Sequence, residues 1–226
     1  MKLLVPTHGT VGLRVSADDV VPHVGTMTRD ILDFVGTSYK FAVKPTIPPG
    51  VAPFMVQNYI FQSGELVSGD SKLPIIQLAI IPNGDMVTAT TTEIADKIMD
   101  DFMERLDATF GFRFATAEKR RVYQSNVVVE FDVLVDEKIS AFKKIEQILN
   151  GASIRSAPFE IKRLAFGYGD IQQIQSISSI EEIENSDFVI ERRSAEPYSR
   201  NRYFCSAPVK TSRLIALLQD IERALG

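Results

Sequence analysis

The sequence predicts an α+β fold, in which an antiparallel or mixed β-sheet carries amphipathic helices on one face as a two-layer sandwich. Three observations predict it. An Asn-Gly pair at Asn83 and Gly84 separates two apolar runs, as in a β-hairpin. Apolar residues recur at helical spacing over residues 94–106. Apolar and polar residues largely alternate over residues 127–135, as in a strand with one buried face.

Residues 1–53 are expected to form an irregular, proline-rich N-terminal arm. Prolines interrupt its short apolar pieces at Pro6, Pro22, Pro45, Pro48, Pro49 and Pro53. Within the arm, the helical spacing of Met27, Ile31 and Val35 predicts a short amphipathic helix. The segment 44–53 is expected to be an extended connector.

Residues 54–226 are expected to form a single α+β domain, with a possible internal boundary near residues 151–157. Its first part should hold strands over residues 54–61, 73–81 and 86–90. Thr90 and Glu93 then have the spacing of a capping box, which predicts a helix that runs to about residue 109.

The second part of the domain again shows strand and helix patterns. The sequences of these parts are not similar enough to indicate an internal repeat. Asp136 can cap a helix that ends at Asn150 and Gly151, and Thr211 or Ser212 can cap a last helix. Segment 171–184 is compatible with a helix or with a loop. Further strands are expected over residues 127–135, 159–168, 188–193 and 200–205.

Composition indicates a soluble globular protein, because 45% of the residues are hydrophobic and 24% are charged. The net charge of −4 gives no overall attraction to nucleic acid or to anionic lipid. Cys205 is the single cysteine, which excludes an intrachain disulfide and favours a cytoplasmic location. The first residues are too short for a signal peptide, and no apolar run has the roughly 18 residues of a membrane span. We therefore expect no membrane contact.

No motif for catalysis, a cofactor or a metal is evident, so the catalytic residues stay unknown and a non-enzymatic role is favoured. The best metal-ligand cluster, His8, Asp18, Asp19 and His23, lacks the spacing of a helical metal site, and we expect neither metal nor cofactor. Cys205 is interpreted as a small core residue. An enzyme whose residues converge only in the fold would draw on Glu130, Asp132, Arg192, Arg200 and Tyr203.

The most suggestive binding residues are arginines and tyrosines near the C-terminus. Arginine with tyrosine is typical of protein interfaces and of single-strand nucleic-acid grooves. The predicted binding residues are Arg192, Arg193, Tyr198, Arg200, Arg202 and Tyr203, and a second small cluster comprises Lys119, Arg120, Arg121 and Tyr123.

The leading hypothesis is a non-enzymatic protein-binding or self-assembly module of a cytosolic complex. Its arm and its Arg/Tyr hairpin, residues 188–206, would contact another copy or a partner protein. An alternative is a nucleic-acid or phosphate-ligand binding protein that uses the same hairpin, although the net charge disfavours it. A further alternative is an enzyme of unknown class.

Overall fold

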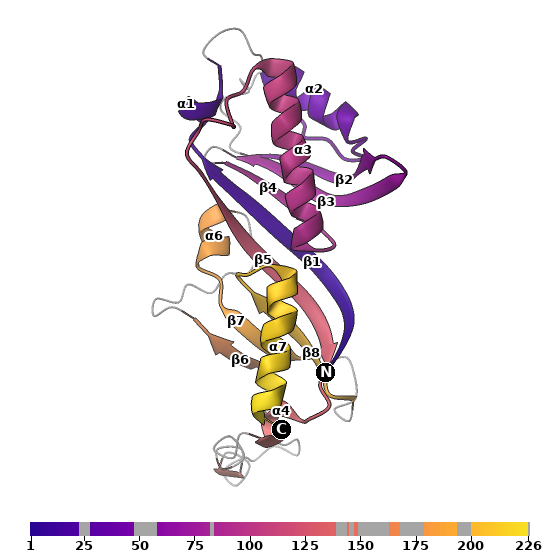
Figure 1. Ribbon diagram of the computed structural model, residues 1–226, viewed down its shortest axis with the longest axis vertical. Helices are drawn as coiled ribbons and strands as arrows, with labels where there is room; N and C mark the ends of the chain where they lie inside the picture. Colours follow the sequence, from indigo (N-terminus) through magenta and orange to yellow (C-terminus); the bar gives the residue numbers. More distant parts are fainter. Residues whose placement is uncertain are drawn as a thin grey trace.

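The described residues form one antiparallel sheet of eight strands, in the order β2-β3-β4-β1-β5-β8-β7-β6 (Figure 1). The computed structural model describes residues 1–22, 28–47, 58–81, 84–138, 163–167, 179–193 and 200–225, with residues 144, 147 and 148. The strands are β1 Lys2–Val15, β2 Tyr59–Ser68, β3 Ser71–Ile81, β4 Gly84–Ala89, β5 Lys119–Glu130, β6 Arg163–Phe166, β7 Phe188–Arg192 and β8 Arg202–Ala207. The helices are α1 Ala17–Val20, α2 Thr28–Ser38, α3 Thr92–Phe110, α4 Val135–Lys138, α6 Ile180–Glu184 and α7 Thr211–Leu225. The predicted α+β class with an antiparallel sheet is confirmed.

The expected irregular arm is wrong for its first part, because residues 2–15 form β1 at the centre of the sheet. β1 pairs with β4 on one side and with β5 along most of its length on the other. Pro6 is tolerated because it lies beside a register shift between Pro6 and His8, in the half of β1 that is paired only with β5 among the described residues. The predicted short helix is confirmed as α2, and the connector 44–53 lies partly outside the described residues.

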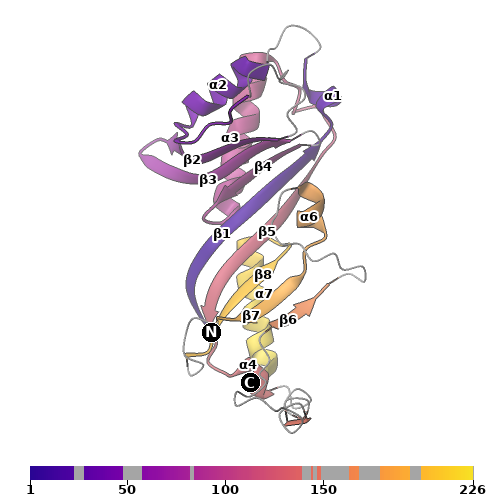
Figure 2. The same ribbon diagram turned by 180° about the vertical axis from the view of Figure 1, so that it is seen from behind.

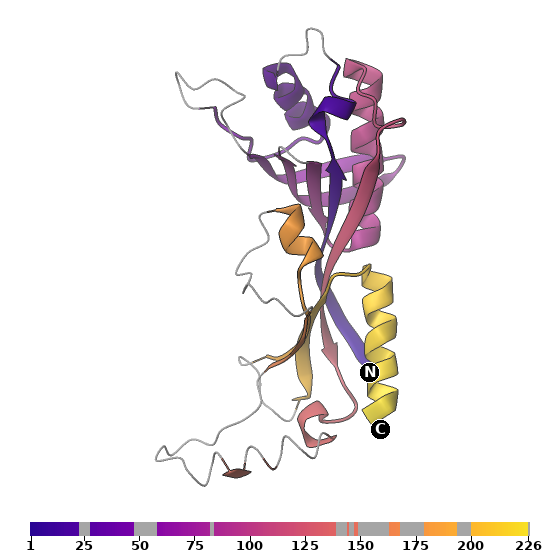
Figure 3. The ribbon, with the colours of Figure 1, turned by 90° about the vertical axis from the view of Figure 1, so that its left-hand side faces the viewer.

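Helices lie on both faces of the sheet, so the expected placement on one face only is not what the described residues show. Helices α3 and α7 lie end to end along one face, which we call the inner face (Figure 3). Helix α6 packs on the opposite, outer face, where Ile180 and Ile183 are fully buried against Met86 and Val122. Gly12 makes room for both isoleucines, because a Cβ atom at Gly12 would lie 3.3 Å from each of them.

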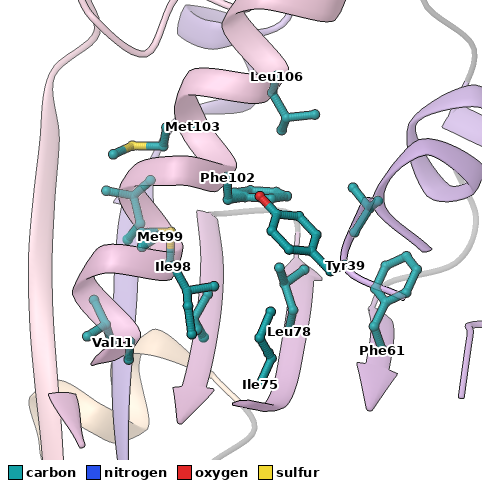
Figure 4. Packing of buried hydrophobic residues seen from close by; sticks show 14 of the residues in the cluster. Val11, Tyr39, Phe61, Ile75, Leu78, Ile98, Met99, Phe102, Met103 and Leu106 are labelled. Atoms are coloured by element: carbon teal, nitrogen blue, oxygen red, sulfur yellow. The ribbon is translucent and has the colours of Figure 1, made fainter. Parts of the chain in front are cut away.

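The main core lies between α3 and the inner face of β1 to β4. Figure 4 shows Ile98, Met99 and Phe102 of α3 pointing toward these strands, with Tyr39 at the end of α2 beside Phe102. Tyr39 is fully buried, and its hydroxyl donates to Asp101 Oδ2 of α3 at 2.8 Å. A second core lies beneath α7 and contains Val127, Val129, Phe131, Tyr203, Cys205, Leu214 and Leu218.

Several predicted boundaries shift by local chemistry. Helix α3 begins one residue later than expected, since Thr91 is its cap and accepts from the Ile94 N–H at 3.3 Å. The strand expected over 127–135 is β5, which begins at Lys119 and ends at Glu130. The strand expected to end near Ser63 continues to Ser68, because the ladder to β3 passes over Ser63, which has a φ of 57°, and resumes in the same register at Gly64. Most of the helix expected from Asp136 to Asn150 lies outside the described residues.

The open segment 171–184 ends in a helix. Ser179 and Glu182 form a reciprocal capping box at the start of α6. The strands predicted over 159–168, 188–193 and 200–205 are confirmed as β6, β7 and β8 with shifted ends. The last helix begins at Thr211. Within the described residues, no helix has the length and apolar character needed to span a membrane.

Candidate functional site

The predicted Arg/Tyr binding residues do not form one exposed surface. Tyr203 is 4% exposed and packs on Phe131 in the core beneath α7. Arg192 is 8% exposed, and its guanidinium lies 5.5 Å from the centre of the Tyr203 ring. Both side chains therefore stabilise the second core through packing and a cation–π contact. They are poorly placed to bind a partner.

The remaining predicted residues separate onto other parts of the molecule. Arg202 lies on the outer face, where its Nε donates to Glu130 Oε2 at 2.9 Å. Arg193 and Arg200 are exposed beyond the ends of β7 and β8. Tyr198 lies outside the described residues. The contact surface expected from the sequence thus has two of its six residues in the core, and much of the expected arm is also in the core.

Arg121 of the second basic cluster is neutralised by acidic residues of α3. Arg121 donates to Asp96 Oδ1 at 2.9 Å and also to Asp100. Lys210 donates to Asp96 Oδ2 at 2.8 Å, and its ammonium lies 4.7 Å from the centre of the Tyr123 ring. The positive charge of Arg121 is therefore balanced within the fold.

A like-charge pair on the outer face is also compensated. Arg14 of β1 and Arg120 of β5 are directly opposite in the antiparallel ladder, which is unfavourable by itself. Glu184 of α6 lies between them: its Oε2 accepts from Arg14 at 3.0 Å, and its Oε1 lies 3.6 Å from Arg120. Glu181 also accepts from Arg14 at 2.7 Å. These charges hold α6 on the sheet.

Polar side chains form a row across the outer face of β4, β1, β5 and β8. Thr10 and Thr88 share a hydrogen bond of 2.9 Å, and Asn126 Nδ2 lies 2.9 Å from His8 Nε2. Burial lowers the pKa of His8. Gln124 adds contacts to Ser206 and Ser186. Because these groups bond to one another, the row stabilises the centre of the sheet.

Asp85 of β4 is the most perturbed carboxyl among the described residues. It is 6% exposed and lies in register with Leu13 of β1 and Ile80 of β3. Burial raises its pKa from 3.8 to about 7. A perturbed acid can mark a functional site, but no described partner group that would make it a general acid or base surrounds it.

Cys205 has the environment of a packing residue. It is fully buried beneath α7, and burial raises the pKa of its thiol to about 12. A thiol in this state carries almost no thiolate at neutral pH and is a poor nucleophile.

The other candidate ligands and acids are dispersed. In the described part of the chain, no three His, Cys, Asp or Glu side chains are grouped to hold a metal ion. Asp18 and Asp19 are exposed on α1, and His23 lies outside the described residues. Glu130 pairs with Arg202, and Asp132 accepts from the Met1 ammonium at 2.7 Å.

An exposed apolar surface that the sequence did not predict lies on the outer face of the β2–β3 hairpin. It consists of Val43, Ile60, Val67 and Ile76, with exposures of 51%, 40%, 46% and 43%. Ile60 lies between the buried Tyr59 and Phe61, so it points away from the core. Val43 bridges to Gln62, which is on the same face as Ile60. We call these four residues the outer hairpin surface.

The signal for this surface was present in the sequence as a strand with apolar residues on both of its faces. Tyr59 and Phe61 alternate with Ile60, and Leu66 is followed by Val67. A strand that is apolar on both sides needs cover on both sides.

No protein-family model matches the chain, and no curated protein matches it.

Proposed function

We propose that the protein is a non-enzymatic self-assembly module, located in the cytoplasm, in which the outer hairpin surface contacts a second copy of the chain. The observation that carries this proposal is the grouping of exposed apolar side chains. Four of the eight large apolar side chains that are exposed among the described residues belong to this one hairpin and to Val43 beside it. Scattered apolar residues are normal on a surface, whereas grouped ones are typical of contact sites.

Charge favours a second copy as the occupant. The polar positions within the surface include the uncharged Gln62 and Gln77, which are directly opposite each other. Glu65 lies between Gln62 and Val67 along β2, and its charge is paired with Lys40 and Lys72, with N to O distances of 2.9 Å and 3.5 Å. A surface whose charges are paired with each other can meet its own copy across a two-fold axis without repulsion.

The outer face of an antiparallel sheet can pack against another sheet at about 10 Å, with interdigitated apolar side chains. Strand addition at β2 is less favoured. The backbone of residues 39–43 already bonds to the middle of its outer edge, through Ala42 N to Ser63 O and Val43 N to Gln62 O. We therefore propose contact between faces.

The test is the molar mass in solution over a wide range of protein concentration. The unchanged protein should pass from monomer to dimer as the concentration rises. An Ile60→Ser/Ile76→Ser variant should dimerise about a hundredfold more weakly, because each buried isoleucine contributes about tenfold to the dimerisation constant. Phe166→Ser is the matched control, since Phe166 is 64% exposed outside this surface. A monomer at every concentration, or an equal effect of the control, would overturn the proposal.

A further inference from the structure

The described strands and long helices fall into two halves of the same order. The first half runs β1, β2, β3, β4, α3, and the second runs β5, β6, β7, β8, α7. From the centre of the sheet outward, the strands are β1-β4-β3-β2 on one side and β5-β8-β7-β6 on the other. Figure 2 shows the two halves meeting along the long β1 and β5 strands. The short helices in the connections differ between the halves.

The strand register relates the halves residue by residue. Gly9 pairs with Ala89 at the end of β4, and Ser125 pairs with Ala207 at the end of β8. Gly9 therefore corresponds to Ser125, and Ala89 to Ala207. Gly9 and Ser125 also pair directly with each other between β1 and β5. A local two-fold axis consequently passes between these two residues.

The same correspondence relates the two cores. Residues paired by the axis occupy the same position beneath their own helix, and each is 0% exposed. The pairs are Val11 with Val127, Leu13 with Val129, Val87 with Cys205, Ala95 with Leu214, and Met99 with Leu218. Agreement of burial at these five pairs is expected if both halves are copies of one structural unit, whereas further along the helices Ile98 and Phe102 are buried and the corresponding Leu217 and Ile221 are partly buried.

The helix starts meet at the axis and complete each other. The Thr211 N–H donates to Thr92 Oγ1 at 2.8 Å, and the Thr92 N–H donates to Thr211 Oγ1 at 3.1 Å. Backbone N–H groups in the first turn of a helix have no partner within the helix. Each half therefore supplies the hydrogen-bond acceptor that the helix of the other half needs, as in a two-fold interface between chains.

We infer that the chain is two copies of one β-β-β-β-α unit fused end to end, and that the surface between them is a two-fold protein–protein interface enclosed in one polypeptide. The interacting partner of each half is the other half. The connection lies between α3 and β5, where Gly111 ends α3 in the left-handed conformation and exposed residues follow. The interface consists of the β1–β5 ladder and the contact between Thr92 and Thr211.

The test separates the halves by a cut in the folded protein. A protease recognition sequence is inserted between Ala115 and Thr116, which are both exposed. After cleavage, the two fragments should elute together with the mass of the whole chain. After unfolding in guanidinium and dilution, they should reassemble. Separation of the fragments, or failure to reassemble where the uncut insertion variant refolds, would overturn the inference.

A cut within one half is the matched control. The same recognition sequence inserted between Gly69 and Asp70, in the exposed turn that joins β2 and β3, divides the first unit. Fragments from this cut should not reassemble after unfolding, and equal reassembly from both cuts would also refute two autonomous units. Thr211→Val in the protein cut at Ala115 should weaken association of the halves about tenfold, since it leaves a buried N–H without an acceptor. Unchanged association would exclude Thr211 from the interface.

Discussion

Asp85 should make the stability of the protein depend on pH in a direction opposite to that of a salt-bridged carboxyl. The folded protein raises its pKa from 3.8 to about 7 by burial. The folded state therefore binds the proton more tightly than the unfolded chain does. The stabilisation is fully present below pH 3.8 and is lost as the pH rises through about 7.

The magnitude follows from the shift, because one pKa unit corresponds to about 1.4 kcal/mol. Relative to the fully protonated state, the charge on Asp85 costs about 1 kcal/mol at pH 4.5 and about 4 kcal/mol at pH 8. Asp85→Asn keeps the shape of the side chain and removes this charge. The stability of the variant relative to the unchanged protein should thus be about 3 kcal/mol greater at pH 8 than at pH 4.5.

Urea unfolding followed by circular dichroism at both pH values measures the effect. Other carboxyl groups titrate in both proteins, so the difference between the two free energies of unfolding isolates Asp85. A difference that stays constant from pH 4.5 to pH 8 would refute the argument, because it would mean that Asp85 has the same pKa in the folded and unfolded states.

Three further predictions concern the centre of the fold. Gly9→Ala should lower the free energy of unfolding by about 3 kcal/mol, because its Cβ would lie 2.2 Å from Thr92 N. Gly69→Ala is the control: its Cβ meets open space, and it should lower the free energy of unfolding by about 1 kcal/mol. Glu184→Gln should destabilise the protein by about 1 kcal/mol at low salt and by less at high salt, because it leaves Arg14 and Arg120 opposite each other without the carboxylate. Urea unfolding at two salt concentrations measures this effect. Cys205 should react with a thiol reagent at pH 8 only after unfolding, and fast reaction in the native protein would contradict its burial.

The elements that the sequence predicts best are those whose pattern is complete within the element. Helix α3 has an apolar stripe, a capping residue and a glycine at its end, and α7 has a similar stripe. β1 was missed because Pro6 and the prolines that follow it indicate an irregular segment when they are considered alone. In the fold, Pro6 lies beside a register shift, and Gly9 and Gly12 are needed because helices approach the strand closely. These reasons involve residues far away in the chain.

The candidate binding residues lie apart from one another for a related reason. A local surplus of arginine does not show which acidic residues the fold will bring near. Arg121 is neutralised by Asp96 and Asp100, and Arg202 by Glu130 across the β5–β8 ladder. Arg192 was expected at the surface, but the long side chain lies over Tyr203 in the core. Sequence distance alone cannot supply these partners.

The two-fold relation left no recognisable repeat in the sequence, because the fold constrains the burial and polarity of each position and not the identity of its residue. Buried positions had to stay apolar, yet Val87 corresponds to Cys205 and Ala95 to Leu214, which differ in volume and type. At the axis, fusion removes a restriction that a dimer of identical chains would have. Glu93 Oε1 accepts from the Ser212 N–H at 3.0 Å, so one half supplies a carboxylate and the other supplies the helix start that it caps. Identical chains would carry the same residue on both sides, and two glutamates would face each other across the axis. A single chain can place one carboxylate between two helix starts, where one negative charge favours both positive ends.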